Sequence, residues 1–160
     1  MKILLAVDSS PCSEAAAETL MRQYKPTDTE VFVLHVVDCP KLPPILYTFG
    51  TGPLFAEDYT KITNQWRCEG EQLVAELSKR FEAAGFKTSS KVEDGDAREL
   101  ILEYAKNWHP DLILLGSHGR RGLDRFLLGS VSEAVPATPL LGRDRARDAA
   151  ITVEASCSPP

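Results

Sequence analysis

Short, uninterrupted apolar runs alternate along this chain with longer segments in which apolar residues recur every three or four positions. The runs at residues 2–8, 31–37 and 111–115 are rich in Ile, Leu and Val, which is typical of strands buried on both faces of a parallel sheet. Residues 87–93 alternate more weakly and predict a further strand, the third in chain order. Strands and helices that alternate in this way predict an α/β domain, with helices covering both faces of an open parallel sheet.

Three segments between the strands have the spacing of amphipathic helices. Ser10 or Ser13 can cap the first, whose apolar face carries Ala16, Ala17, Leu20, Met21 and Tyr24. A second helix is predicted at 57–84. Its apolar stripe, which we expect to lie in the core, consists of Ile62, Trp66, Leu73, Leu77 and Phe81. A third is predicted at 97–108, behind a capping box of Asp96 and Glu99.

Two other segments do not have a helical or strand pattern. Residues 38–55 contain several prolines and glycines and predict a long loop, which is either a variable insertion or a lid over a site. The four acidic or glycine residues at 93–96 are explained by the positive end of the helix dipole that follows them, and a metal site there is disfavoured.

A glycine-containing segment follows the fourth predicted strand and is the main candidate for binding chemistry. It reads Leu115-Gly116-Ser117-His118-Gly119 and continues, after nine residues, with Gly129-Ser130-Val131-Ser132. Glycines allow a tight turn or a close approach to a ligand, and Ser130 can cap a helix whose free amides attract an anion. Each residue alone is an ordinary turn or cap residue, but together they predict a phosphate site without a Walker lysine.

This segment resembles the G-x2-G-x9-G-[S/T] signature of the ATP-binding branch of the universal stress protein family. Gly116, Gly119, Gly129 and Ser130 match its four positions. The resemblance extends over residues 1–135 and includes Val7-Asp8-Ser9-Ser10, Leu34-His35-Val36-Val37-Asp38 and Gly95-Asp96. It implies one Rossmann-like domain at 1–135, with five parallel strands in the order 3-2-1-4-5.

The resemblance also implies that ATP binds between the first and fourth strands. Asp8 would contact the nucleoside end and Val36 would offer backbone groups to adenine. The ribose and phosphates would be held by Leu115, Gly116, His118, Gly119, Gly129, Ser130, Val131 and Ser132. The chemistry of these groups agrees, since a carboxylate accepts hydrogen bonds from ribose hydroxyls and a strand end exposes amides that can read a base edge. Asp8 could instead cap the following helix, or hold magnesium through water.

A nucleotide-dependent regulator of the stress response is expected rather than an enzyme. Useful hydrolysis needs a positioned base and a cationic clamp on the γ-phosphate, usually with a firmly held metal, and only His118 and Asp8 are candidates for a slow ATPase. An ATP pyrophosphatase is disfavoured because residues 7–11 lack the glycines of its loop. The remaining alternative is a dimeric or adaptor member of the family that works without nucleotide, although that branch lacks the glycine signature.

Composition and charge narrow the expected partners. A chain of 160 residues, 43% hydrophobic and with a net charge of -5, fits one domain and argues against a broad nucleic-acid surface. The apolar run at 3–7 is too short to span a membrane, and no signal peptide is recognisable. The four cysteines show no C-x-x-C spacing and the three histidines are scattered, so we expect a cytoplasmic protein with reduced thiols and without a metal site made by its side chains.

Residues 136–160 form an atypical tail. Pro136 and Pro139 should end the helix begun at Ser130 early. Read one nucleotide later, the codons of 140–147 permit Cys-Ser-Val-Glu-Ile-Val-Arg, which resembles the last strand of the family and suggests a shifted reading frame. In the present frame, residues 149–155 are the candidate fifth strand. The homodimer that the resemblance implies uses that strand and therefore depends on it.

Overall fold

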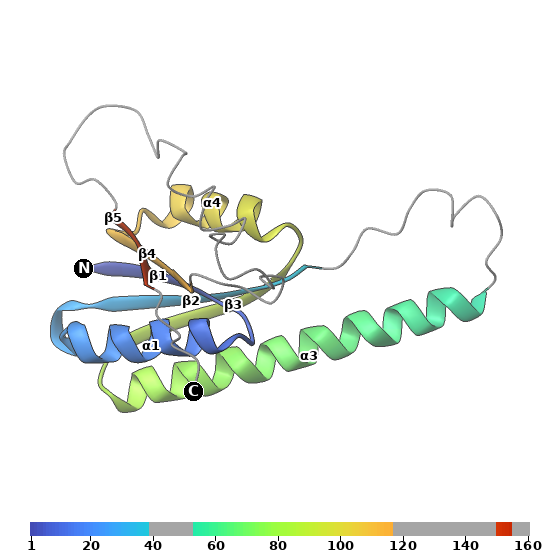
Figure 1. Ribbon diagram of the computed structural model, residues 1–160, viewed down its shortest axis with the longest axis horizontal. Coiled ribbons are helices and arrows are strands. Elements are labelled where there is room, and N and C mark those ends of the chain that lie inside the picture. Colours follow the sequence, from blue (N-terminus) through green and yellow to red (C-terminus); the bar gives the residue numbers. More distant parts are fainter. Residues whose placement is uncertain (39–52, 117–149, 155–160) are drawn as a thin grey trace.

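The described residues of the protein form one parallel sheet of five strands, in the order β3-β2-β1-β4-β5 (Figure 1). The computed structural model describes residues 1–38, 53–116 and 150–154. Its strands are β1 (Lys2–Val7), β2 (Glu30–Val37), β3 (Lys87–Asp94), β4 (Leu112–Gly116) and β5 (Ala150–Glu154). The expected strand order is thereby confirmed. β5 falls within the predicted 149–155 and pairs in parallel with β4, from Leu112–Ala150 to Gly116–Glu154.

Helices cover both faces of this sheet, as the alternating pattern predicts (Figure 1). Helices α1 (Pro11–Gln23) and α3 (Pro53–Ala83) lie on one face and α4 (Ala97–Trp108) on the other, with a short 3-10 turn, η1 (Pro26–Asp28), before β2. Alternate residues of a strand point to opposite faces. Ile3 and Leu5 therefore pack toward Leu20 and Phe81 of α1 and α3, whereas Leu4 packs toward α4.

The long helix α3 differs from its prediction at its amino-terminal end. It begins at Pro53, within the segment predicted as a loop and four residues before the expected start at 57. Val74, Leu77 and Phe81 are buried, but Ile62 is 46% exposed, so the prediction that the whole stripe is core was wrong. The helix extends past the sheet, and its first half therefore has no strand beneath it (Figure 1).

Helices α1 and α4 begin at the N-cap residues that the sequence predicted. The Ser10 hydroxyl accepts a hydrogen bond from the Ser13 amide at 3.2 Å, so Ser10 is the N-cap of α1. The Asp96 carboxylate accepts one from the Glu99 amide at 3.0 Å and caps α4. The first cap matters for function, because it fixes the loop that leaves the carboxyl end of β1.

Candidate functional site

The winding of the sheet reverses at β1, and this places a crevice at the carboxyl ends of the central strands. β1 pairs with β2 on one side and with β4 on the other. In open parallel sheets, ligands bind outside the carboxyl ends of the strands at such a reversal. Asp8 follows β1 directly and Gly116 ends β4, with Ala6 paired to Leu115 just before them. The structure therefore brings Asp8, Leu115 and Gly116 to one edge.

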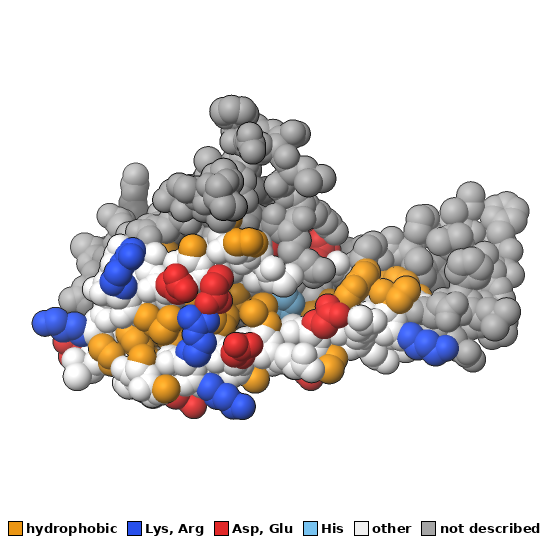
Figure 2. Space-filling view, turned by 60° about the horizontal axis from the view of Figure 1, so that its bottom comes forward, with side chains coloured by type: hydrophobic (Ala, Val, Ile, Leu, Met, Phe, Trp, Pro, Cys, Tyr) orange, Lys and Arg blue, Asp and Glu red, His pale blue; other side chains and the backbone are white. Residues whose placement is uncertain are grey.

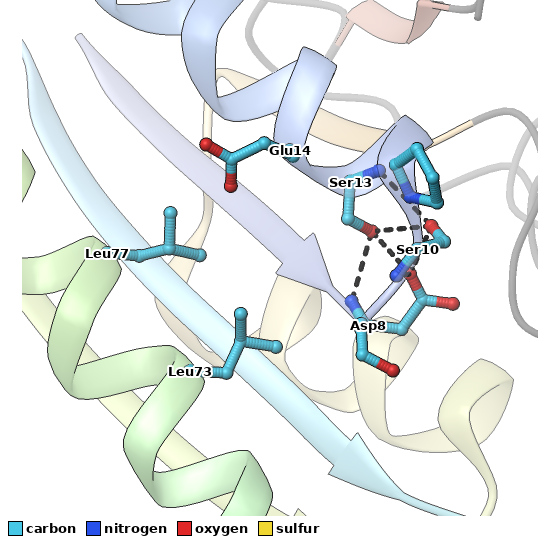
Figure 3. A pocket seen from close by; sticks show the side chains of 8 residues that line it. Asp8, Ser10, Ser13, Glu14, Leu73 and Leu77 are labelled. Carbon is cyan, nitrogen blue, oxygen red and sulfur yellow. Dashed lines mark hydrogen bonds between the residues drawn. The ribbon is translucent and has the colours of Figure 1, made fainter.

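The carboxylate of Asp8 is held by the first turn of α1 (Figure 3). Its Oδ1 accepts hydrogen bonds from the Ser10 hydroxyl at 2.5 Å, the Ser13 hydroxyl at 2.6 Å and the Ser10 amide at 3.1 Å. The Asp8 amide in turn donates to the Ser13 Oγ at 3.0 Å. The cap of α1 is Ser10, as described above, and Asp8 orients that cap. Three donors on one oxygen also give this carboxylate a defined direction.

Val36 lies one residue beyond the last pair between β1 and β2, which is Val7–His35. The next residue, Val37, accepts a hydrogen bond from the Gly95 amide at 3.2 Å, so its backbone groups face β3. Backbone groups of successive strand residues point to opposite sides. The amide and carbonyl of Val36 therefore face the β1 side. In the register of Val7 with His35, the amide meets the Val7 carbonyl, whereas the Val36 carbonyl lies beyond the last pair of the ladder, next to Asp8.

Gly116 is required by packing between β4 and α1. A Cβ atom added there would lie 2.9 Å from the Cys12 carbonyl carbon, 2.9 Å from the Ser13 nitrogen and 3.1 Å from the Cys12 Cβ. Backbone atoms cannot move aside as the end of a flexible side chain can. Gly116 thus allows the strand end to approach the capped turn that holds Asp8, whatever else it contributes to ligand binding.

A hollow of about 350 Å³ opens beside this turn, between α1 and α3 (Figure 3). Its polar wall is the loop and first turn after β1, and its apolar wall consists of Leu73 and Leu77. Glu14, also at its rim, forms an ion pair with Arg80 of α3. That α3 borders the site could not be predicted from sequence, because periodicity identifies an apolar face but not the element that it meets.

Charges on the surface around α1 and α3 are of both signs and are interspersed, as Figure 2 shows for this side of the molecule.

At the neighbouring end of β3, Glu93 is paired in register with Val36. Hydrogen bonds from Lys91 and from the Tyr104 hydroxyl lower the pKa of Glu93 below its usual range. The pairing with Glu93 raises the pKa of Lys91, and burial raises that of Tyr104. Glu93 therefore stays ionised and paired with Lys91 to a lower pH than an unpaired glutamate would.

The remaining predicted site residues lie outside the described part of the chain. They are His118, Gly119, Gly129, Ser130, Val131 and Ser132. Their roles stay predictions. Within residues 1–38, 53–116 and 150–154 there is no group of three or more His, Cys, Asp or Glu side chains placed to bind a metal. None of the helices in these ranges is long and apolar enough to cross a membrane.

His35 makes a contact at the site edge that the sequence did not indicate. The ring is buried and its Nδ1 lies 2.8 Å from the Val7 carbonyl oxygen. Ser13 is likewise buried, at 4% exposure, although only its role as a possible cap was considered from sequence. The signal that could have identified His35 is its position two residues before the end of β2, a strand that is paired with β1 in the fold.

Comparison with known proteins points to one family. The family model described as the universal stress protein family matches residues 1–137. Universal stress protein MJ0531 of Methanocaldococcus jannaschii is 31% identical over 134 residues, covering 84% of this chain and 74% of the relative. Universal stress protein MJ0577 of the same organism is 29% identical over 140 residues, covering 84% of this chain and 86% of the relative.

Solved structures agree with this comparison. The structure of MJ0577 superposes with a TM-score of 0.74 at 26% identity, covering 95% of this chain and 93% of the other. A universal stress protein family protein from Arabidopsis thaliana, solved with AMP bound, has a TM-score of 0.63 at 18% identity and covers 96% and 90%. A universal stress protein in complex with cAMP has a TM-score of 0.57 at 17% identity and covers 96% and 95%. At these lower identities the likeness concerns the fold.

Proposed function

The chain belongs to the universal stress protein family, and from that membership we propose that it binds an adenine nucleotide, ATP in the first instance, at the edge between β1 and β4. Binding would make it a nucleotide-dependent regulator in the stress response. The observation that carries the proposal is the placement of Val36 and Asp8. The Val36 carbonyl, which faces the β1 side beyond the last pair of the ladder, provides an acceptor for the amino group of a base, and the fixed Asp8 carboxylate beside it provides an acceptor for ribose hydroxyls.

Two further observations support an adenine nucleotide. Relatives with the same fold have been solved with AMP and with cAMP, which share the adenosine part. In this chain the last residue of β4 and the segment after it also keep all four positions of the glycine signature: Gly116, Gly119, Gly129 and Ser130. On this proposal, backbone amides and the Ser130 hydroxyl hold the phosphates. Asp8 could hold a magnesium ion through water, because its carboxylate has a fixed direction.

The alternative proposal, a dimer or adaptor that works without nucleotide, is favoured by one observation. β5 is the last strand in the sheet order and so has a neighbour on one side within the described strands. An edge strand of this kind can pair with the same strand of a second copy. Because Ala150–Glu154 already supplies this strand, the sheet does not require the alternative reading frame in the tail at 136–160. The coding DNA tests that frame directly.

Calorimetric titration with ATP, with and without magnesium, tests the proposed function. We expect saturable binding that ADP and AMP share and that GTP does not. Gly119→Val should abolish it, because a branched side chain would fill the predicted phosphate turn. Gly119 is a better probe than Gly116, whose substitution would also disturb the packing on Cys12 and Ser13. Lys25→Ala, an exposed change before the amino end of β2, is the control that should bind as the unaltered protein does. Absence of binding to the unaltered protein would favour the adaptor alternative.

A further inference from the structure

His35 contacts the peptide group that carries Asp8. Its ring is 5% exposed, and Nδ1 lies 2.8 Å from the Val7 carbonyl oxygen. A carbonyl oxygen only accepts hydrogen bonds, so the contact requires the proton to be on Nδ1. The bond joins β2 to the last residue of β1, at the point where the ladder between these strands ends.

The same peptide group is held from its other side by α1. The Val7 carbonyl and the Asp8 amide belong to one planar peptide unit. The amide donates to the Ser13 Oγ at 3.0 Å, while the carbonyl accepts from His35. Rotation of this unit would break one bond or both. The direction of the Asp8 carboxylate, whose Oδ1 also accepts from Ser13 at 2.6 Å, is therefore tied to His35 through the backbone.

Helix α3 holds the imidazole in place through Gly70. A Cβ atom at this position would lie 2.4 Å from Cδ2 and 2.8 Å from Nε2 of His35. Glycine in the interior of a helix costs about 1 kcal/mol relative to alanine, and Gly70 lies within the 31 residues of α3. The close approach of the ring gives a physical reason for glycine here, because alanine would push the ring away from Val7.

We propose that His35, which packs against Gly70, is a positioning residue for nucleotide binding: it fixes the Val7–Asp8 peptide and thereby orients Asp8. This inference rests on the proposed function. It gives α3 a part in positioning the site beyond lining the hollow with Leu73 and Leu77: a displacement of α3 at Gly70 would be transmitted through the imidazole to the carboxylate. His35 touches no ligand atom in this arrangement and acts through Asp8 alone.

Two substitutions at His35 test the role of the Nδ1 donor. His35→Asn retains a donor close to the position of Nδ1, since the amide nitrogen is equally far from the Cα atom, whereas His35→Leu removes the donor at similar bulk. We expect His35→Leu to weaken ATP binding about fivefold to tenfold, the usual effect of one lost hydrogen bond. His35→Asn should recover most of that loss. Thermal unfolding of both variants shows whether they fold, and a merely structural role would lower stability without the recovery of affinity.

Gly70→Ala tests the packing of the His35 ring against α3. On its own it should weaken ATP binding by a similar factor, whereas in the His35→Leu background it should have little further effect, because its influence passes through the imidazole. Ala75→Gly, at an exposed position of the same helix, is a control for helix propensity and should leave affinity unchanged. Equal losses from Gly70→Ala in both backgrounds would overturn the connection between Gly70 and His35.

A nitrogen NMR spectrum of the histidine rings tests the geometry without nucleotide. We expect the His35 ring to carry its proton on Nδ1, and a proton on Nε2 alone would overturn the inference. Failure of the unaltered protein to bind ATP would overturn the proposed function and the positioning role together. Unchanged ATP affinity in folded His35→Leu, with the unaltered protein binding, would overturn the positioning role alone.

Discussion

Replacement of Gly116 by alanine is the sharpest structural test of how the candidate site is assembled. The added methyl group would lie 2.9 Å from the backbone of Cys12 and Ser13, closer than carbon atoms approach in folded proteins. To relieve the contact, the end of β4 and the first turn of α1 must separate by several tenths of an ångström. That turn contains Ser10 and Ser13, which hold the Asp8 carboxylate.

The expected loss of stability follows from two opposing effects. Overpacking of a well-packed site costs about 1–3 kcal/mol, whereas Gly→Ala restricts the unfolded chain and stabilises by about 0.4–1 kcal/mol. We therefore expect a net loss of about 1–2 kcal/mol, since the clash is with backbone atoms. For a protein of this size, that loss lowers Tm by about 2–8 °C. Gly116→Val should cost more than Gly116→Ala, because its side chain is larger.

Urea denaturation followed by circular dichroism, together with thermal unfolding, measures these values. Ser9→Ala is the control, since Ser9 is exposed on the same loop and its substitution should change stability by less than about 0.5 kcal/mol. A Gly116→Ala protein as stable as the unaltered one, or more stable, would show that the approach of β4 to α1 does not require glycine. The reasoning about the packed strand end would then be wrong.

Three further predictions concern the cap, an ion pair and the long helix. Ser10→Ala should lower the free energy of unfolding by about 1 kcal/mol, because it removes the cap of α1. Urea denaturation measures this loss, with Ser9→Ala as the control. An effect no larger than that of the control would contradict the cap assignment. Glu93→Gln should destabilise at pH 7 by about 0.2–1 kcal/mol. Because the pKa of Glu93 is lowered in the folded state, its contribution is present above the unfolded value and disappears as the pH falls through the folded one, so denaturation curves of the two proteins should converge in acid. A constant difference across that range would contradict the pairing with Lys91 and Tyr104. Leu77→Ala should lower the free energy of unfolding by about 2–5 kcal/mol, because Leu77 is only 2% exposed. Ile62→Lys should lower it by less than about 0.5 kcal/mol, because Ile62 is 46% exposed. Similar losses for both variants in chemical denaturation would show that both halves of α3 are core.

The proposed function and the stability predictions are connected at the start of α1. Ser10 caps the helix through the Ser13 amide, and the hydroxyls of both residues hold Asp8, so a change in either should alter both stability and ATP affinity. Changes at Leu77 should alter stability with a smaller effect on ATP affinity. This apolar side chain lines the hollow but takes no part in the hydrogen bonds that hold Asp8. Measuring both quantities on each variant therefore separates positioning from packing.

The sequence by itself determined the elements and their class. Strand and helix periodicity depends on which face of each element is buried, and that information is local. The α4 helix was predicted with the bounds it has, Ala97–Trp108, because Asp96 and Pro110 mark its two ends. The order of the strands came instead from the resemblance of the glycine segment and strand ends to a known family, and the structure confirms it.

Only the tertiary structure decided which of these residues meet. The stripe on α3 has one period throughout, yet its first half extends past the sheet and Ile62 is exposed, because periodicity does not report how far a sheet reaches. Gly116 and Gly70 each leave space for a group from a distant segment, the α1 backbone and the His35 ring. Such contacts depend on distances between elements far apart in sequence, and these distances are set by packing of the whole core rather than by any local pattern.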